Sequence, residues 1–236
     1  MSRGALIVFE GLDRSGKSTQ AKLLRDHIRK SGRDAEIIRF PGMSLYLSNV
    51  PFFYLFLIHF LLNKWDLYRN ITCLLDRLDS TGQLIDQYLK GEVDFSEQAL
   101  HLLFSANRWQ KAAEIKNKIG KGVDVICDRY FISGIAYSLA KGLNEHWVRQ
   151  SDVGLPLPDL VFFFKLSPEE AMNRTGFGEE RLETEPMQRK VAEAMTTLKQ
   201  SYWREVDANN DPHSVENVVQ ELYAAISREH PLGVVE

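Results

Sequence analysis

The sequence has few cysteines and no surplus of basic charge. Cys73 and Cys127 are its two cysteines, and they lie far apart in a chain of 236 residues. This usage offers neither a disulfide framework nor a zinc-ligand cluster and is typical of a reducing compartment. The formal net charge is −3. Composition therefore gives no support to nucleic-acid binding, and we expect none.

The N-terminus lacks the features of a secretory signal. Its apolar stretch is short and leads into a glycine-rich turn rather than a cleavage site. We therefore expect a cytoplasmic protein, with the nucleus and mitochondria left open. Hydrophobic residues make up 44% of the chain and charged residues 26%, ordinary values for a globular protein. The length allows one domain over residues 1–236 with a sizeable core.

Short apolar runs alternate with segments of helical periodicity. This alternation predicts βαβ units and hence an α/β fold, with a five-stranded parallel sheet flanked by helices. The expected strands cover residues 5–9, 35–40, 123–127, 160–164 and 203–206. The expected helices cover residues 16–30, about 100–119, and 214–227 at the C-terminal end.

One long segment is unusually apolar. No formally charged residue lies between Phe40 and Asn63, and residues 45–62 are dominated by Leu, Phe, Tyr and Ile. Length alone would permit a transmembrane helix. A single crossing would, however, place Lys17 and everything after Lys64 on opposite sides of the membrane. Because both halves are expected to build one site, we predict no transmembrane span.

A phosphate-binding motif follows the first predicted strand. Residues 11–18, GLDRSGKS, match G-x-x-x-x-G-K-[ST] between a buried strand and a helix. Gly11 and Gly16 allow backbone angles that a Cβ would block, and the turn directs N–H groups and a helix N-terminus at phosphates. Lys17 would reach the β- and γ-phosphates, and the Ser18 hydroxyl would bind Mg²⁺. The alternative is a chance glycine-rich turn. The motif predicts Mg-ATP as the cofactor.

The motif by itself does not separate a kinase from a switch GTPase. A GTPase should carry an Asn-Lys-x-Asp guanine motif, and the nearest match, residues 117–120 (NKIG), lacks the Asp. Asp128 and Arg129 end the third apolar run, where a P-loop protein reaches Mg²⁺ with an Asp and binds phosphate with an Arg. The alternative for this pair is a salt bridge between Asp128 and Arg129 at the strand end.

Four blocks of the sequence resemble the thymidylate kinases. They are FEGLDRSGKSTQ (9–20), LFSANRW (103–109), DRYFISGIAY (128–137) and GLPLPDL (154–160). The resemblance implies a P-loop NTPase fold and transfer of the γ-phosphoryl of ATP to thymidine monophosphate, which gives the diphosphate. It also implies a homodimer. Two alternatives stay open: a deoxynucleoside kinase, and a nucleotide-binding homologue without activity.

The same resemblance assigns roles to individual residues. Phe104 would stack on the thymine ring and Arg108, four residues on and hence on the same helix face, would hydrogen-bond the base edge. A core Phe and a surface Arg are the alternative. The implied catalytic residues are Asp13, Arg14, Lys17 and Arg129. The implied ATP-binding residues are Gly11, Ser15, Gly16, Lys17, Ser18, Thr19 and Arg174, with Ser18 and Asp128 at the metal. The implied acceptor-binding residues are Phe40, Arg77, Phe104, Arg108, Arg129, Ser133, Gly134 and Tyr137.

A lid is expected over residues 167–188. Two glycines at 176 and 178 would give it mobility, and closure would exclude water. Arg174 would stack on adenine or pair with a lid glutamate. The family pattern has a tyrosine where this sequence has Leu182, which leaves discrimination against ribonucleotides open. Arg14 resembles a catalytic arginine carried by the P-loop, and an exposed basic residue is the alternative.

The resemblance is interrupted by an insertion. Residues 42–75 separate Phe40-Pro41 from Asp76-Arg77, and their deletion restores Phe-Pro-Asp-Arg. The insertion is a loop with an apolar surface, a membrane-surface anchor, or a translated intron. We favour the intron because the segment is in frame, splits a motif and has no selected-looking pattern.

Overall fold

The computed structural model describes residues 2–41, 80–175, 177–178 and 180–236. The insertion at 42–75 and the predicted acceptor residue Arg77 lie outside the described residues, so their predictions are untested. Among the helices of the described ranges, none combines the length and the apolar character that a membrane crossing requires.

Five strands of the described chain form one sheet in the order β2-β3-β1-β4-β5, with every neighbouring pair parallel. The prediction of a five-stranded parallel sheet is thus confirmed. The central strand, β1, is buried along its whole length, whereas the edge strand β5 has two buried and three exposed residues. The strands are β1 (Leu6–Gly11), β2 (Ala35–Arg39), β3 (Asp124–Asp128), β4 (Leu160–Lys165) and β5 (Trp203–Asp207).

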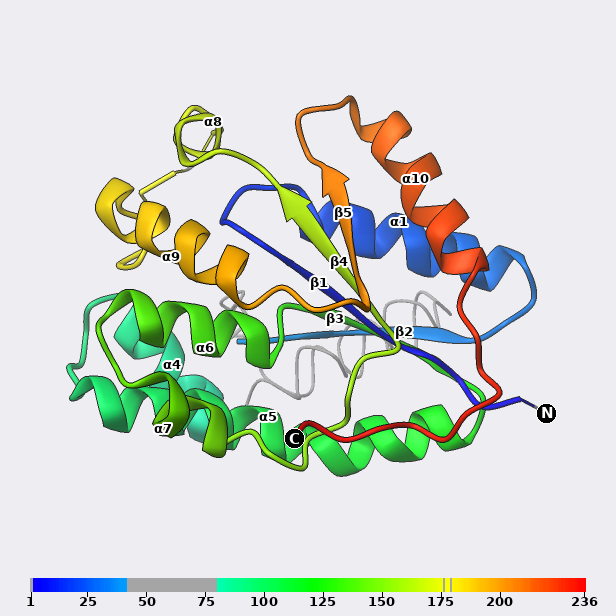
Figure 1. Cartoon of the computed structure of the whole chain (residues 1–236), viewed down its shortest axis with the longest axis horizontal. Helices are drawn as coiled ribbons and strands as arrows, with labels where there is room; N and C mark the ends of the chain where they lie inside the picture. The colour runs from blue at the N-terminus through cyan, green and yellow to red at the C-terminus, as the bar shows by residue number, and fades with distance from the viewer. Residues whose placement is uncertain (1, 42–79, 176, 179) are drawn as a thin grey trace, which may run out of the picture.

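Helices cover both faces of this sheet (Figure 1). α1 and α10 pack on one face, and α5, α6 and α9 on the other. The helices of the described ranges are α1 (Lys17–Lys30), α4 (Ser80–Leu89), α5 (Glu97–Gly120), α6 (Phe131–Ala140), α7 (Glu145–Gln150), α8 (Pro168–Met172), α9 (Glu185–Thr197) and α10 (Pro212–Ala224).

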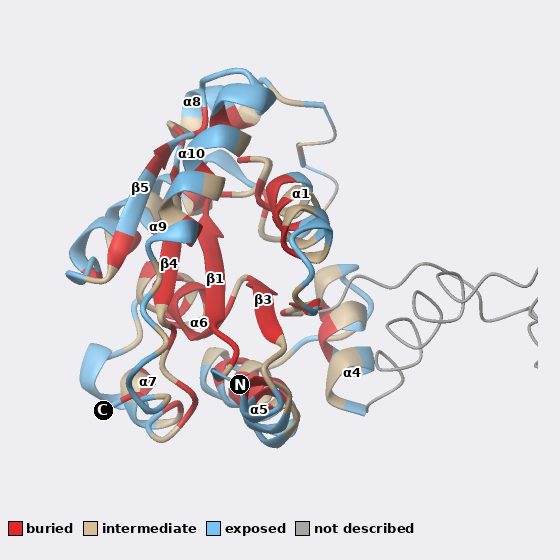
Figure 2. Cartoon of the chain, turned by 90° about the vertical axis from the view of Figure 1, so that its right-hand side faces the viewer, coloured by how far each residue is buried: buried red, intermediate tan, exposed pale blue. Residues whose placement is uncertain are grey.

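The side chains of β1 alternate between two cores, one on each face. Leu6 and Val8 belong to the core beneath α5 and α6, whereas Ile7 and Phe9 belong to the core beneath α1 and α10. Figure 2 shows β1 and β3 as buried strands between these helices, and β4 is buried over most of its length. Each such aliphatic or aromatic side chain contributes about 2 kcal/mol by burial. Burial on both faces explains why these strands read as continuous apolar runs rather than alternating ones.

The last helix differs from its prediction. It spans Pro212–Ala224, so it begins about two residues and ends about three residues before the predicted bounds of about 214–227. Asp211 caps the helix by accepting hydrogen bonds from the backbone N–H groups of His213 and Ser214, and Pro212 occupies the first turn. An acidic cap followed by proline is a strong start signal, and the apolar periodicity alone did not identify it.

The strand order decides where the loops gather. Because all strands run in parallel, the segments that follow β1, β2, β3 and β4 leave the same edge of the sheet. Ligands of such sheets bind outside the carboxyl ends of the strands, where the order reverses. β1 lies between β3 and β4, so the phosphate-binding motif after β1 stands at that position.

The opposite end of β3 is held by a buried carboxylate. Asp124 accepts hydrogen bonds from Ala5 N (2.7 Å), Arg33 (3.2 Å), the Tyr223 hydroxyl (2.6 Å) and Arg228 (3.1 Å). Burial by itself raises the pKa of Asp124, but hydrogen bonds from Arg33 and Tyr223 and the nearby positive charges outweigh it. The pKa therefore lies below its ordinary value, and the carboxylate ties β1, β3 and the segment after α10 together.

We predict that Asp124→Asn lowers the free energy of unfolding at pH 7 by about 3 kcal/mol, because two arginines lose their shared partner. A lowered folded-state pKa stabilises the protein above the unfolded-state pKa of about 3.9, and the benefit is lost as pH falls through the folded-state value. The difference between the wild type and the variant should thus be constant above about pH 5 and shrink below pH 4.

Urea unfolding at several pH values measures this difference. Asp26→Asn is the matched control, since the Arg25–Asp26 pair is exposed and should change stability by less than about 1 kcal/mol. Equal effects of the two substitutions would contradict the assigned role of Asp124.

Candidate active site

The motif after β1 forms a turn whose backbone points toward a cavity. Gly11 and Gly16 have φ angles of 141° and 88°, a region that side chains disfavour, and Arg14 between them has φ 63°. A Cβ on Gly11 would lie 2.5 Å from the backbone oxygen of Phe164 in β4. No side chain caps the N-terminus of α1, which begins at Lys17. Its first N–H groups are therefore available to an anion.

Lys17 is a buried cation that no carboxylate of the described residues binds directly. It is 5% exposed, and its Nζ donates to the Leu12 carbonyl (2.5 Å) and to the Ser15 hydroxyl (3.1 Å). Burial, reinforced by the charge of Arg129, lowers the pKa of Lys17 to about 7. A phosphate group at this point would supply the missing negative charge, so the pocket around Lys17 fits a nucleotide triphosphate.

Ser18 and Asp128 meet at the predicted metal position. The Ser18 hydroxyl donates to Asp128 Oδ2 at 2.5 Å, and Arg39 Nε lies 3.3 Å from the same oxygen. Asp128 therefore pairs with Arg39 and not with Arg129, so the strand-end salt bridge between neighbours is wrong. A hydroxyl and a carboxylate beside a phosphate site are suitable ligands for Mg²⁺.

The acceptor side is centred on Arg129 and Asp13. Arg129 has φ 67° and donates to the Gly11 carbonyl (3.0 Å), to the Ser133 hydroxyl (2.9 Å) and to the Asp13 carboxylate. The Tyr137 hydroxyl donates to Asp13 Oδ2 at 2.6 Å. Burial alone would raise the pKa of Asp13, but the charges of Arg129 and Lys17 and two hydrogen bonds outweigh burial and lower it. Asp13 is thus an ionised acceptor of hydrogen bonds.

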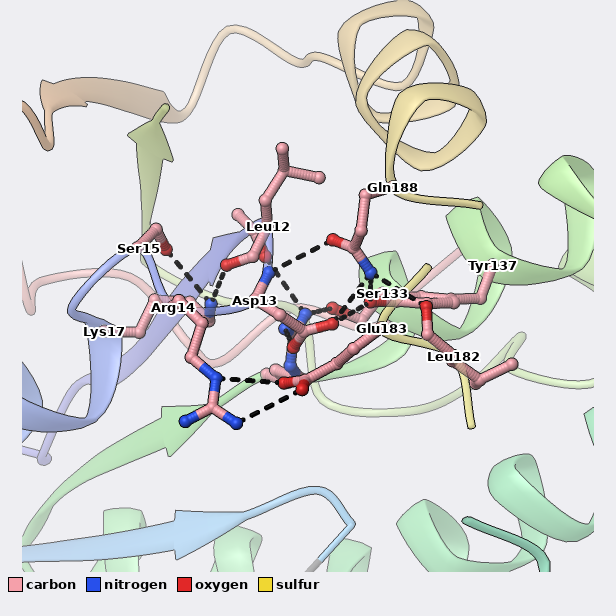
Figure 3. Close-up of polar contacts among 12 residues, drawn as sticks. Leu12, Asp13, Arg14, Ser15, Lys17, Ser133, Tyr137, Leu182, Glu183 and Gln188 are labelled. Carbon is pink, nitrogen blue, oxygen red and sulfur yellow. Dashed lines mark hydrogen bonds and ion pairs between the residues drawn. The ribbon is translucent and has the colours of Figure 1, made fainter. Parts of the chain in front are cut away.

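Two residues that the sequence did not single out, Gln188 and Glu10, complete this network, and Figure 3 shows Gln188 beside Asp13 and Tyr137. Gln188 of α9 is fully buried, and its Nε2 donates to Asp13 Oδ2 (2.9 Å) and lies 3.1 Å from the Tyr137 hydroxyl. Glu10 is also fully buried and accepts from the backbone of Tyr130 and from Ser133 at the start of α6. A charged residue inside the apolar run of β1 was the available signal for Glu10; nothing in the sequence marked Gln188.

The predicted lid lies against the P-loop. Glu183 accepts from Arg14 Nε (3.1 Å) and Nη2 (3.2 Å) and also from the backbone N–H of Gly178. Arg14 is therefore an ion-pair partner of the lid rather than a free surface residue. Arg174 donates to the carbonyls of Arg14 (2.7 Å) and Ala208 (2.6 Å), and among the described lid residues no glutamate accepts a hydrogen bond from it. Its contact with adenine stays a prediction.

One cavity of about 760 Å³ connects these groups. It reaches from the P-loop to the far end of α5, where Phe104 and Arg108 both line it. Arg108 is only 2% exposed and forms a two-pronged ion pair with Asp152, so the alternative of a surface arginine is wrong. Of the predicted site residues, the lining includes Asp13, Arg14, Gly16, Lys17, Ser18, Thr19, Phe40, Phe104, Arg108, Asp128, Arg129, Ser133, Gly134, Tyr137 and Arg174.

This combination of features defines a class of protein. The sheet is parallel, a P-loop follows its central strand, and a cavity of nucleotide size has buried cations on both sides of that loop. These features are typical of a P-loop phosphotransferase. The model of the thymidylate kinase family matches residues 76–222. A thymidylate kinase of Caenorhabditis elegans is 51% identical over 236 residues, covering 99% of this chain and 96% of the relative.

Less similar relatives are also thymidylate kinases. The human thymidylate kinase is 35% identical, with 98% of this chain and 96% of the human protein covered. The solved structure of thymidylate kinase from Candida albicans superposes with a TM-score of 0.78 at 31% identity, covering 100% of both chains. This chain belongs to the thymidylate kinase family, whose members are nucleoside monophosphate kinases.

We predict that Gly11→Ala lowers the free energy of unfolding by about 3 kcal/mol, because the new Cβ meets the backbone of β4 and the φ angle is strained. Gly120→Ala is the control, since a Cβ there has no neighbour within 4 Å and should change stability by about 1 kcal/mol or less. Thermal unfolding measures both. A Gly11→Ala protein as stable as the control would contradict this account of the loop.

Proposed function

We propose that this protein transfers the γ-phosphoryl group of ATP to thymidine monophosphate and so forms thymidine diphosphate. The observation that carries the proposal is the single cavity, which has the P-loop cation Lys17 at one end and the pair Phe104 and Arg108 at the other. Arg129 and Asp13 lie between these ends. A donor phosphate and a flat base can thus bind at opposite ends of one space.

The chain supplies charge and position rather than a covalent intermediate. The acceptor phosphate is itself the nucleophile, so what is needed is neutralisation of charge as the two phosphates approach. Lys17 and the N-terminus of α1 would bind the donor phosphates, and Arg129 the acceptor phosphate. Ionised Asp13 would accept a hydrogen bond from the acceptor sugar. Mg²⁺, held through Ser18 and Asp128, would add positive charge between the phosphates.

Arg14 and Arg129 are held before substrate arrives. Arg129 is bound by Asp13 and by the Gly11 carbonyl, and Arg14 by Glu183 of the lid. Both guanidinium groups lie in the lining of the cavity. Fixing a cation in place before the reaction removes the cost of reorganising it in the transition state. These two arginines are therefore our candidates for charge stabilisation during transfer.

We further propose that residues 167–188 act as a lid within a single domain of residues 1–236. Arg181 supports this role, because its backbone N–H donates to the Leu89 carbonyl and its guanidinium pairs with Asp94 at 2.5 Å. The same guanidinium lies over the Tyr88 ring, 4.5 Å from its centroid. The lid thereby contacts α4 and the connection from α4 to α5, and its closure would exclude water from the cavity.

A cytoplasmic homodimer completes the proposal. Leu102 and Trp109 of α5 are 49% and 41% exposed, and large apolar side chains on one helix suit a subunit interface. The predicted mass of the particle in solution is therefore twice 27.1 kDa. Light scattering after size-exclusion chromatography measures that mass.

We predict that Lys17→Ala lowers kcat/KM with ATP and thymidine monophosphate by at least about 100-fold while the protein stays folded. The reason is that the variant lacks the buried ammonium group that would stabilise the donor phosphates. ADP formation measures the rate with thymidine monophosphate, with thymidine and without acceptor. Lys22→Ala, on the exposed face of α1, is the control and should keep full activity. Faster turnover with thymidine would favour a nucleoside kinase, and no turnover an inactive homologue.

A further inference from the structure

Arg108 is held in the interior by a single carboxylate. Its Nε donates to Asp152 Oδ1 at 3.0 Å and its Nη2 to Oδ2 at 2.8 Å. Arg108 is 2% exposed and Asp152 is fully buried. A two-pronged pair of this kind fixes the plane of the guanidinium as well as its position. The orientation of Arg108 is therefore determined by Asp152, which comes from the turn after α7.

The Nη1–Nη2 end of this guanidinium lies directly against Gly134 of α6. A Cβ at position 134 would come within 2.7 Å of Nη1, 2.8 Å of Nη2 and 3.0 Å of the central carbon of Arg108. No side chain larger than hydrogen fits there without displacing the group. The family resemblance placed Gly134 in the nucleoside pocket. Because it has no side chain, Gly134 leaves the space that the Arg108 guanidinium occupies.

A polar scaffold holds Asp152 in turn. The Ser105 hydroxyl lies 2.8 Å from Asp152 Oδ1, and the backbone N–H of Asp152 donates to the Arg149 carbonyl. His101 beside it contacts the Val148 carbonyl through Nε2 and the Ser138 hydroxyl through Nδ1. Burial and the charge of Arg108 lower the pKa of His101.

Arg108 has donors beyond those that Asp152 binds, and its side chain belongs to the cavity lining. With Nε and one N–H of Nη2 bound to Asp152, the two N–H groups of Nη1 have no partner among the described residues, and Arg108 lines the cavity. A guanidinium has donors and no acceptor. At the end of the cavity beside Phe104, the Arg108 guanidinium therefore offers hydrogen-bond donors and no acceptor.

We propose that Asp152 is the positioning residue that makes this pocket selective for a pyrimidine with a carbonyl oxygen, rather than an amino group, at the edge facing Arg108. The inference rests on the proposed function and deepens it. A carbonyl oxygen accepts a hydrogen bond from Nη1. An amino group would place its own donor next to the Arg108 donor, and both donors would be buried without an acceptor. Sites with buried hydrogen-bonding groups reject such mismatched ligands strongly.

The experiment compares Asp152→Asn with the wild type. The amide keeps the size of the carboxylate but replaces one acceptor with a donor, so the two-pronged grip on Arg108 is lost. The probes are deoxyuridine and deoxycytidine monophosphates, used as competitive inhibitors of phosphorylation of thymidine monophosphate. Their bases differ at one edge in a carbonyl or an amino group. The ratio of their inhibition constants reports edge selectivity even where neither is turned over.

We expect this ratio to fall by at least about tenfold in Asp152→Asn. KM for thymidine monophosphate should rise much more than kcat falls, because the contact acts on binding, and KM for ATP should stay unchanged. The preference for thymidine over deoxyuridine monophosphate, which reports the methyl group, should also be unchanged. Ser105→Ala, which removes one contact to Asp152 and leaves the pair intact, is the matched control and should keep the ratio within about threefold.

A double-mutant cycle separates positioning from structural support. If Asp152 acts through Arg108, the double variant Asp152→Asn, Arg108→Met should have the same ratio of inhibition constants as the single variant Arg108→Met. Asp152→Ser, which is smaller and brings no amide donor, provides a second variant should the amide fail to fold. An equal loss for both inhibitors, with their ratio intact, would overturn the inference. A wild-type protein inactive on thymidine monophosphate would instead overturn the proposed function.

Discussion

The structure depends on compensating several cations that are buried around one cavity. A buried charge without a partner costs several kcal/mol, and three arginines around the cavity pair with a carboxylate: Arg129 with Asp13, Arg108 with Asp152 and Arg14 with Glu183. Lys17 differs, because the oxygens that its ammonium contacts in the described part of the chain are neutral and its pKa is lowered to about 7. The unmet charge lies where the donor phosphates would bind.

These carboxylates come from different parts of the fold. Asp13 lies in the P-loop, Asp152 follows α7, and Glu183 lies in the lid region before α9. Each of these ion pairs therefore joins two segments that are distant from one another in the sequence. Packing of α6 against α5 and α9 brings those elements together. Stability and function are linked here, because the contacts that hold the cations also join the layers.

Some of the geometry is strained for the same reason. Arg14 and Arg129 adopt φ angles of 63° and 67°, which cost a non-glycine residue about 1 kcal/mol or more. Hydrogen bonds from the Arg129 backbone to Phe9 and from its side chain to Gly11 hold it there. Both strained residues line the cavity, as expected where backbone shape serves a site.

The sequence by itself determined the sheet, the P-loop and most of the cavity lining, because these depend on local patterns: apolar runs buried on both faces, glycines in a turn, and motif blocks. The tertiary structure decided which side chains form ion pairs and hydrogen bonds with one another. That Asp128 pairs with Arg39 rather than Arg129, that Arg108 is buried on Asp152, and that Gln188 reaches Asp13 all follow from contacts between residues distant in the chain. Spacing along a sequence cannot specify such contacts, because they arise only when packed layers bring the side chains together.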